Sequence, residues 1–248
     1  MSMKNTGWEG FKELVLVDRV EECPGIVSFY FKDKSGGKLV KHKPGQFLPF
    51  KIKTENQKYK GVVRTYSLSI VPNENMYRIS VKKIDNGLIS SYLHDELKIG
   101  DTIEAMSPTG VFTIKESSKN KPIVLISAGI GVTPLLSMLY EESKTRNDIY
   151  FVQAVQNSDI HPFKDDIKYI SKDKGFKNTV FYSKPLDTDK EGLDYDFVGR
   201  VNEEWIKNNL PLNADYYFCG PPPFMKGVES SLLNLGLSKD SINYELFS

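Results

Sequence analysis

Two short motifs, set far apart in the chain, combine residue types that suit cofactor chemistry. Arg64-Thr65-Tyr66-Ser67 presents a cation, an aromatic ring and hydroxyl groups on one extended segment, and Cys219-Gly220-Pro221 places a thiol and a turn of little side-chain bulk after an apolar stretch. An arginine can hold a phosphate through two hydrogen bonds, and a tyrosine can stack on a flat ring. Ser67 can offer its hydroxyl or amide to a ring nitrogen. The pair predicts a flavin that takes hydride from a nicotinamide. An ordinary strand with a solvent-facing Arg64 and a packed Tyr66 is the alternative for the first motif.

Two glycine-containing turns stand where helices are expected to begin. Gly87-Leu88-Ile89-Ser90 opens a predicted helix, and the free amides of a helix N-terminus bind anions. Simple capping by Asn86 or Ser90 is the alternative. Gly129-Ile130-Gly131-Val132-Thr133-Pro134 lies between a predicted strand and a predicted helix, where its glycines permit close approach of a dinucleotide. This second turn departs from the usual dinucleotide fingerprint, because Pro134 takes the place of the third glycine.

The cysteines and histidines narrow the chemistry further. Cys219 ends an apolar strand, which is where parallel sheets bind ligands, so we expect a functional role beyond that of a buried small hydrophobe. It is not expected to be a nucleophile, because no histidine lies near it in sequence. His42, His94 and His161 show no metal-ligand spacing and are expected in surface or core roles. No metal site is predicted.

The first half of the chain has the pattern of an antiparallel β structure. Segments rich in β-branched and aromatic residues alternate with turn signals, and one helix is expected at 88–97. Several short strands of this kind predict a small antiparallel barrel or sandwich. The expected strands are 13–17, 26–31, 46–52, 62–69 and 76–83.

The pattern changes near the polar stretch Ser117–Lys121, which is the expected linker. Beyond it, apolar strands alternate with helices, which predicts a parallel sheet covered by helices on both faces. We therefore expect a flavin-binding antiparallel β-barrel domain at 1–117 and a nucleotide-binding α/β domain at 118–248. The expected strands are 123–127, 149–155, 179–183, 215–219 and 242–247, with helices starting at Thr133, about Phe163, Asn202 and Pro222.

Composition excludes several classes of protein. The net charge of +1 gives no reason to expect nucleic acid or a membrane surface as partner. Cys23 and Cys219 are the only cysteines, too few for a disulfide scaffold or a four-cysteine zinc or iron–sulfur site. The segment Met1–Trp8 lacks the apolar core of a signal peptide, and the longest nearly apolar run, 122–132, is far shorter than the roughly 20 residues of a membrane span. We expect a cytoplasmic protein.

With these motifs in view, the chain resembles the ferredoxin–NADP reductase superfamily, and more closely the reductase portion of flavohemoglobins. The resemblance extends over nearly the whole chain, with its motifs in the same order. They include Gly7-Trp8-Glu9-Gly10-Phe11, Lys43-Pro44-Gly45-Gln46-Phe47, Arg64 to Ser69, Gly87 to His94, Gly129 to Pro134, Cys219 to Met225 and Tyr244-Glu245-Leu246-Phe247. The resemblance implies FAD in the barrel domain and NADH or NADPH in the α/β domain.

The resemblance also implies roles for individual residues. Arg64 is expected on the FAD pyrophosphate, Tyr66 on the isoalloxazine and Ser67 near flavin N5. The remaining FAD-binding set comprises Gln46 and Phe47 beside the flavin, Thr65, and Gly87, Leu88, Ile89 and Ser90 at the phosphates. Thr133 and Cys219 are expected to border the nicotinamide, Phe247 to cover the flavin and Glu245 to lie close by. The other nucleotide-binding candidates are Gly129, Gly131, Pro134, Ser183, Lys184, Gly220 and Pro221.

The choice of coenzyme and of electron acceptor stays open at this point. Flavohemoglobin-like NADH enzymes tend to have an acid where Lys184 stands, and a lysine there can attract a 2′-phosphate or be an ordinary surface lysine. The balance favours NADH. The sequence contains no globin-like segment and too few cysteines for a ferredoxin module, so a separate acceptor is expected: a ferredoxin, flavodoxin, rubredoxin, globin or small molecule. The alternatives are an electron-transfer subunit of a larger complex, or a regulatory module without hydride transfer. The oligomeric state is left open.

Overall fold

The computed structural model describes residues 7–247, so most of the N-terminal segment Met1–Trp8 lies outside the described residues. The chain divides after Thr113 into two compact units, here the N-terminal unit and the C-terminal unit. The polar stretch expected as a linker is an integral part of the C-terminal unit. It forms a single-turn 3-10 helix, Glu116–Asn120, whose fully buried Ser118 donates a hydrogen bond to Asp215 at 2.7 Å.

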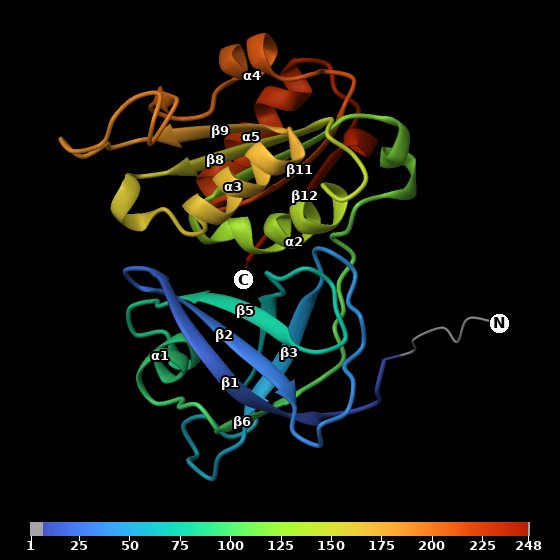
Figure 1. The fold of residues 1–248 in the computed structure, drawn as a ribbon, viewed down its shortest axis with the longest axis vertical. Helices are drawn as coiled ribbons and strands as arrows, with labels where there is room; N and C mark the ends of the chain where they lie inside the picture. The colour runs from blue at the N-terminus through green and yellow to red at the C-terminus, as the bar shows by residue number, and fades with distance from the viewer. Residues whose placement is uncertain (1–6, 248) are drawn as a thin grey trace. The chain divides into compact units, whose positions relative to one another are not determined.

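The N-terminal unit is an antiparallel sheet whose two edges meet. Its strand order is β4-β3-β6-β1-β2-β5, and a bridge between Leu68 and Ile79 joins the β4 end to β5, which closes the sheet into a barrel. The strand β6 was missed in the sequence because it has only four residues. The elements are β1 (Lys12–Cys23), β2 (Ile26–Asp33), β3 (Phe47–Ile52), β4 (Val63–Ser67), β5 (Tyr77–Lys82), α1 (Leu88–Asp95) and β6 (Thr102–Ala105) (Figure 1).

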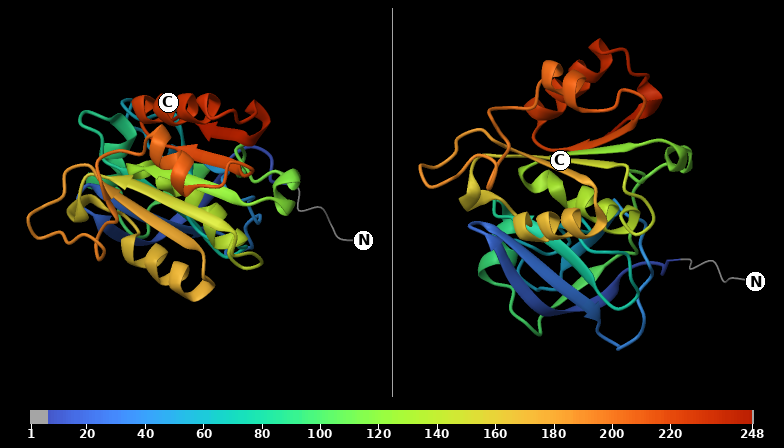
Figure 2. Two further views of the ribbon diagram at one scale, coloured as in Figure 1. Left: turned by 90° about the horizontal axis from the view of Figure 1, so that it is seen from above. Right: turned by 45° about the horizontal axis from the view of Figure 1, so that its top comes forward.

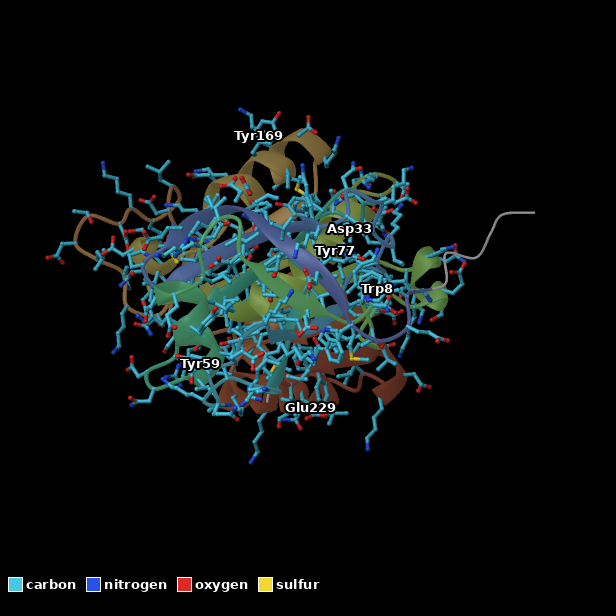
Figure 3. The ribbon with its side chains drawn as sticks, turned by 90° about the horizontal axis from the view of Figure 1, so that it is seen from below. Trp8, Asp33, Tyr59, Tyr77, Tyr169 and Glu229 are labelled. Carbon is cyan, nitrogen blue, oxygen red and sulfur yellow. The ribbon has the colours of Figure 1, made fainter. Side chains whose placement is uncertain are left out.

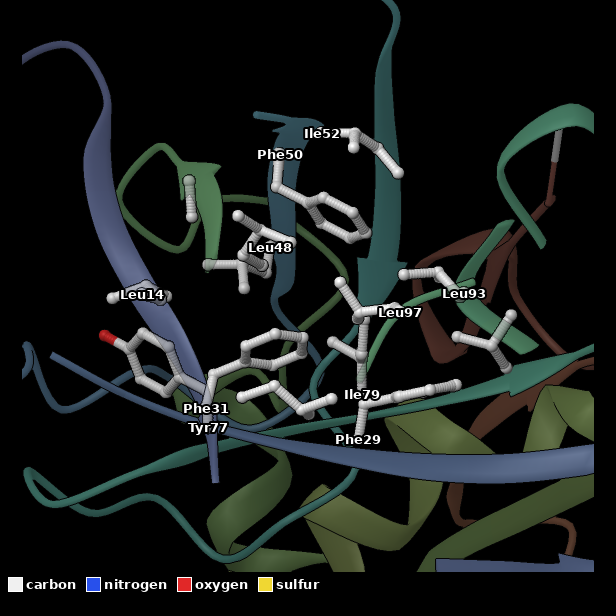
Figure 4. Close-up of a cluster of buried hydrophobic side chains, with 14 of the residues drawn as sticks. Leu14, Phe29, Phe31, Leu48, Phe50, Ile52, Tyr77, Ile79, Leu93 and Leu97 are labelled. Atoms are coloured by element: carbon white, nitrogen blue, oxygen red, sulfur yellow. The ribbon is translucent and has the colours of Figure 1, made fainter. Parts of the chain in front are cut away.

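Strand alternation fills the barrel. The odd-numbered apolar residues of β2 and β5, such as Phe29 and Ile79, are buried and join α1 residues in one apolar core (Figure 4). Each side chain of this size contributes about 1.5–3 kcal/mol when it is removed from water. This core gives the strands a fixed register, so the residues between the apolar positions are held at defined places on the opposite face.

An aromatic contact covers one part of the barrel. The Trp8 ring stacks on Tyr77 with centroids 6.4 Å apart, and its Nε1 donates to the Ala105 carbonyl at 3.0 Å. Figure 3 shows Trp8, Tyr77 and Asp33 grouped in this region. The fully buried Tyr77 also donates its hydroxyl to the Val40 carbonyl at 2.6 Å. The segment before β1 and the one before β3 are thereby attached to the barrel.

The C-terminal unit is a parallel sheet of order β10-β9-β8-β7-β11-β12. Figures 1 and 2 show α2 and α3 on one face of this sheet and α4 and α5 on the other. The elements are β7 (Ile123–Ala128), α2 (Val132–Glu142), β8 (Ile149–Val155), α3 (Lys164–Lys174), β9 (Lys177–Tyr182), β10 (Phe197–Val198), α4 (Glu203–Asn209), β11 (Asp215–Cys219), α5 (Pro222–Asn234) and β12 (Ile242–Glu245), with 3-10 turns at Gly129–Gly131, Ser158–Ile160 and Lys239–Ser241.

Local signals fix the ends of the helices. Asn202 caps α4 by accepting a hydrogen bond from the Trp205 amide at 2.9 Å, and Pro222 opens α5, where its missing amide costs nothing. Gly175 ends α3 in the left-handed region, at φ +73°. The last strand ends at Glu245, two residues earlier than expected. Within residues 7–247, no helix combines the length and the apolar character that a membrane crossing needs.

Candidate cofactor sites in the two units

The sheet register of the N-terminal unit brings the first motif next to a second predicted segment. In the β3–β4 ladder, Phe47 pairs with Ser67 and Leu48 with Tyr66. The Leu68 amide donates to the Gln46 carbonyl at 2.9 Å, which continues the ladder. The residues expected beside a flavin, although about 20 positions apart in sequence, therefore lie on adjacent strands.

Strand β4 changes from exposed to buried along its length. Arg64 and Thr65 are exposed, Tyr66 is half-buried and Ser67 is buried. Tyr66 stacks on Phe50 with ring centroids 5.6 Å apart. Burial raises the pKa of Tyr66 to about 12, and the charge of Arg64 opposes that rise. Tyr66 is thus a neutral ring at physiological pH, supported from behind by a core aromatic residue.

The cation of the motif is accessible. The Arg64 side chain donates to the carbonyl of its neighbour Val63 at 2.9 Å, and among the described residues it has no ion pair with a carboxylate. A guanidinium in this state keeps most of its donors for an anion from solution. The alternative of an ordinary solvent-facing arginine fits the same contacts, so the phosphate role stays a prediction.

The start of α1 provides a second group of donors in the same unit. Gly87 is its N-cap residue, makes no side-chain capping bond, and the first turn contains no acid. The alternative, simple capping by Asn86 or Ser90, is not what the structure has: Ser90 Oγ accepts from the Ile84 amide at 3.2 Å. Tyr92 of α1 packs on Tyr59, which precedes β4, with centroids 4.9 Å apart. Because no side chain caps the helix and its first turn contains no acid, the first amides of α1 remain available to an anion.

One predicted flavin neighbour has its side chain occupied. The Oε1 atom of Gln46 accepts from the Lys43 amide at 2.8 Å and closes the turn before β3. Its backbone carbonyl, bonded to Leu68, ties that turn to the end of β4. The Phe47 ring covers Gly110, where an added Cβ would lie 2.9 Å from the ring. Both residues hold the local backbone in place.

In the C-terminal unit, the two glycine-bearing motifs touch each other. A Cβ added to Gly131 would lie 2.2 Å from the Cys219 carbonyl oxygen. A Cβ added to Gly220 would lie 2.8 Å from the Ala128 Cβ. The absence of side chains here makes room for neighbouring protein atoms. The prediction that Gly131 permits close approach of a dinucleotide stays a prediction, and the sequence could not reveal this contact across about 90 residues.

Gly129 is the loop position that remains open. It has φ +53°, in the left-handed region, and no atom lies within 4 Å of a Cβ built there. Thr133 and Pro134 are buried in the first turn of α2, where Thr133 Oγ1 donates to the Ile130 carbonyl at 3.0 Å. The accessible part of this loop is its backbone, directly after β7.

The carboxyl ends of β7, β11 and β12 bring the remaining candidates together. Cys219 pairs with Ser127 on one side and with Glu245 on the other. Cys219 is fully buried, and burial first, then the charge of Glu245, raises the pKa of its thiol well above the usual range. The thiol is therefore neutral and not an activated nucleophile. Phe247, two residues beyond β12, is 42% exposed.

The two residues predicted near the adenosine ribose lie at the end of β9. The Ser183 amide donates to Val155 at 3.0 Å and the Lys184 amide to Gln156 at 2.9 Å, so the β8–β9 ladder extends to these positions. Both side chains are exposed. β7 lies between β8 and β11, so the strand order reverses there, and in sheets of this kind ligands bind beyond the carboxyl ends at such a point.

His161 lies in a buried hydrogen-bond network of the C-terminal unit. His161 is buried and lies 2.9 Å from Gln153 Oε1 and 3.0 Å from the Tyr182 hydroxyl. Because Gln153 donates its amide to Asn178, His161 Nε2–H must be the donor toward Gln153 and Nδ1 the acceptor from Tyr182. Burial lowers the pKa of His161 to about 3. Among residues 7–247, no group of three or more His, Cys, Asp or Glu side chains could hold a metal ion.

Comparison with known proteins agrees with the division of the chain into an N-terminal and a C-terminal unit. Residues 13–114 match the oxidoreductase FAD-binding domain, and residues 125–230 match the oxidoreductase NAD-binding domain. The flavohemoproteins of Rhizobium meliloti (strain 1021) and Bacillus subtilis (strain 168) are 41% and 36% identical to this chain over 97% of its length, and it covers 61% and 60% of theirs. The chain thus spans about three-fifths of the length of these curated relatives.

Solved structures show the same fold. The flavohem-like FAD/NAD binding domain of nitric oxide dioxygenase from Vibrio cholerae is 32% identical, with a TM-score of 0.85, and the match covers 95% of this chain and 98% of that one. The cytochrome b5 reductase domain of Ulva prolifera nitrate reductase shares the fold at 19% identity, with a TM-score of 0.80 and coverage of 96% and 97%. The fold and the matched domains define an NAD(P)H-dependent flavin oxidoreductase of the ferredoxin reductase type. Within that class, the chain belongs to the family of flavohemoprotein FAD/NAD-binding domains.

The described residues fit both cofactors. A flavin nucleotide needs cations and amides for its phosphates and an apolar support for its ring. Arg64, the start of α1 and the Tyr66–Phe50 stack supply these groups within one unit. A pyridine nucleotide needs an open backbone turn at the carboxyl edge of a parallel sheet, and the turn at Gly129 supplies one.

Proposed function

We propose that this chain takes hydride from NADH or NADPH onto FAD and passes the electrons to a separate acceptor. The observation that carries the proposal is that each unit provides one cofactor-type site: exposed Arg64 with the uncapped start of α1 in the first, and the open Gly129 turn in the second. Bound FAD accepts two electrons as hydride and can release them one at a time.

The residues contribute binding and orientation. Arg64 and the first amides of α1 would hold the FAD phosphates, and Tyr66 would pack on the ring with Phe50 behind it. Ser67, buried at the end of β4, would present its hydroxyl or amide to the ring edge, with Thr65 and Phe47 beside it. Hydride transfer depends mainly on the alignment of donor and acceptor, so the proposed mechanism gives these residues no acid–base role.

In the C-terminal unit, backbone groups of Gly129–Pro134 and Gly220–Pro221 would bind the nucleotide, while Ser183 and Lys184 would meet its adenosine end. Cys219 and Thr133 would border the nicotinamide. The neutral thiol is a suitable neighbour for a group that gives up hydride, because it brings no charge. Glu245 and the exposed aromatic ring of Phe247 would complete the site. NADH is the coenzyme we favour.

The curated relatives are named flavohemoproteins, and one solved relative is a flavohemoglobin from Malassezia yamatoensis with bound FAD and heme. Other structures of this fold are a ferredoxin reductase and a cytochrome P450 reductase. We therefore place a haem protein, such as a single-domain globin, first among the acceptors, with a ferredoxin, flavodoxin or rubredoxin and small molecules following. A subunit that works only within a larger complex is the second candidate.

The test is anaerobic spectroscopy. The protein reconstituted with FAD is mixed with NADH and, separately, with NADPH, and flavin absorbance is followed. Rapid bleaching with one coenzyme supports the proposed function and identifies the donor. Bound flavin that neither coenzyme bleaches contradicts a reductase active by itself. Addition of an oxidised globin, then of an oxidised ferredoxin, to the reduced protein identifies the acceptor class by the rate of flavin reoxidation.

A further inference from the structure

A row of hydrogen-bonded serine hydroxyls, here the hydroxyl chain, connects β2, β5 and Ser69, the residue that follows Leu68. Ser28 and Ser80 are directly paired in the β2–β5 ladder, and their Oγ atoms lie 2.7 Å apart. Ser69 Oγ lies 2.7 Å from Ser80 Oγ. All three serines are at most 3% exposed. At one end Ser28 donates to the Glu22 carboxylate, and at the other Arg78 Nε donates to Ser69 Oγ at 3.1 Å.

The two charged ends fix the direction of every hydrogen bond in this chain. An ionised carboxylate can only accept hydrogen bonds, so the Ser28 hydroxyl uses its one proton to donate to Glu22. The bond between Ser28 and Ser80 must then use the Ser80 proton, and the bond between Ser80 and Ser69 must use the Ser69 proton. Arg78 completes the order as a pure donor. The contact from Ser69 Oγ to the Arg78 carbonyl, at 3.3 Å, is longer than the one to Ser80. All the bonds therefore point from the guanidinium to the carboxylate.

The hydroxyl chain ends at Ser69, on the backbone segment that carries the candidate flavin-binding residues of β4. The Ser69 amide donates to the Arg78 carbonyl at 2.9 Å, and Arg78 Nη2 donates to the Ser69 carbonyl. Ser69 is thus held through its amide, its carbonyl and its hydroxyl. Ser67 lies two residues before it on the same segment, and the intervening Leu68 is bonded to Gln46. A displacement of Ser69 would move the end of β4.

We propose that Ser80 and Ser28 are positioning residues, which act through Ser69 to hold Ser67 and Tyr66 in the geometry that binds FAD. Glu22 and Arg78 orient the hydroxyl chain, and hydrogen bonds aligned in one direction reinforce one another. The flavin part of this inference rests on the proposed function. The positioning part is a property of the protein alone, and it is measurable without cofactor.

The experiment removes the middle hydroxyl. In the flavin-free protein, Ser80→Ala is expected to speed hydrogen exchange of the Ser69 amide by about tenfold, because one buried hydrogen bond is lost on each side of position 80. The same variant is expected to weaken FAD binding by about tenfold in a titration. Ser80→Thr keeps the hydroxyl and is expected to restore both values.

A second pair of variants changes no side-chain volume. Glu22→Gln allows the chain to reverse, because an amide can donate as well as accept, and we expect a smaller change in the same two measurements. Glu21→Gln removes the same charge one residue away, on an exposed side chain, and is the control. Unchanged Ser69 exchange and FAD affinity in Ser80→Ala, or equal effects of Glu22→Gln and Glu21→Gln, would overturn the proposal. Failure of wild-type protein to bind FAD removes the proposed function, while the exchange data still decide the positioning role.

Discussion

The N-terminal unit and the C-terminal unit build their candidate sites in opposite ways. In the barrel, most candidates are side chains of β4, exposed at Arg64 and buried at Ser67, with their register set by the core, and the start of α1 adds backbone amides. In the parallel sheet, the candidates are mostly backbone turns at the carboxyl ends of strands, where the side chains of Thr133 and Cys219 are buried. The comparison indicates that the barrel would bind its cofactor mainly through side chains on its strands. The parallel sheet would bind its cofactor mainly through backbone groups of the loops at the carboxyl ends of its strands.

The largest effect is expected from Gly131→Ala, which tests the backbone character of the second site. Its Cβ would lie 2.2 Å from the Cys219 carbonyl oxygen, so the two loops must move apart. We expect a loss of about 3 kcal/mol in the free energy of unfolding, measured with urea, as for other overpacked positions.

The control for that change is Gly227→Ala, on the exposed side of α5, where no atom lies within 4 Å of the added Cβ. It should be neutral or stabilising by up to about 1 kcal/mol, because alanine favours helix. Equal effects of the two substitutions would show that contact between the loops does not decide the role of Gly131.

The next effect concerns the side-chain character of the first site. Arg64→Ala should weaken FAD binding by about 10- to 100-fold, the range for loss of charged hydrogen bonds to a phosphate. Fluorescence titration with FAD measures it. Lys32→Ala removes one exposed positive charge from β2 and should leave the affinity within about twofold. Full flavin occupancy of the Arg64 variant would contradict the phosphate role.

A pH titration compares the interiors of the units. The folded-state pKa of His161 is about 3, below the ordinary 6.5, so its contribution to stability is present above pH 6.5 and is lost as the pH falls toward 3. From this group alone we expect the C-terminal unit to lose about 2 kcal/mol between pH 7 and pH 5. NMR should show the imidazole neutral at pH 5, and a midpoint near 6.5 would refute the buried assignment. His94 of the barrel is half-buried, and burial lowers its pKa as well.

The smallest effect is expected at the rim of the sheet. Lys184→Glu should weaken NADPH binding by about five- to tenfold more than NADH binding, because an exposed charge acts on the 2′-phosphate through solvent. Lys172→Glu makes the same charge change on an exposed residue of α3 and serves as the reference. Parallel shifts for both coenzymes in the Lys184 variant would show that this residue does not read the 2′-position.

The sequence predicted the elements where a local pattern is strong. Long alternating or apolar strands such as β2 and β7, and helix starts marked by Asn202 and Pro222, appear within a residue or two of their expected places. The short β6 and β10 were missed, because two to four residues carry too little periodicity. The stretch at Ser117 looked like a linker because it is polar, although its Ser118 is buried through a hydrogen bond to the distant Asp215.

The sequence by itself determined the class of fold and the motifs that a flavin and a pyridine nucleotide need, since both are written in local spacing and residue type. Only the tertiary structure decided why Gly131 must be glycine, how His161 is protonated and which serines join Glu22 to Arg78. These features depend on atoms brought together from distant parts of the chain. Close packing and the single proton of each hydroxyl then leave one arrangement, and no local pattern encodes it.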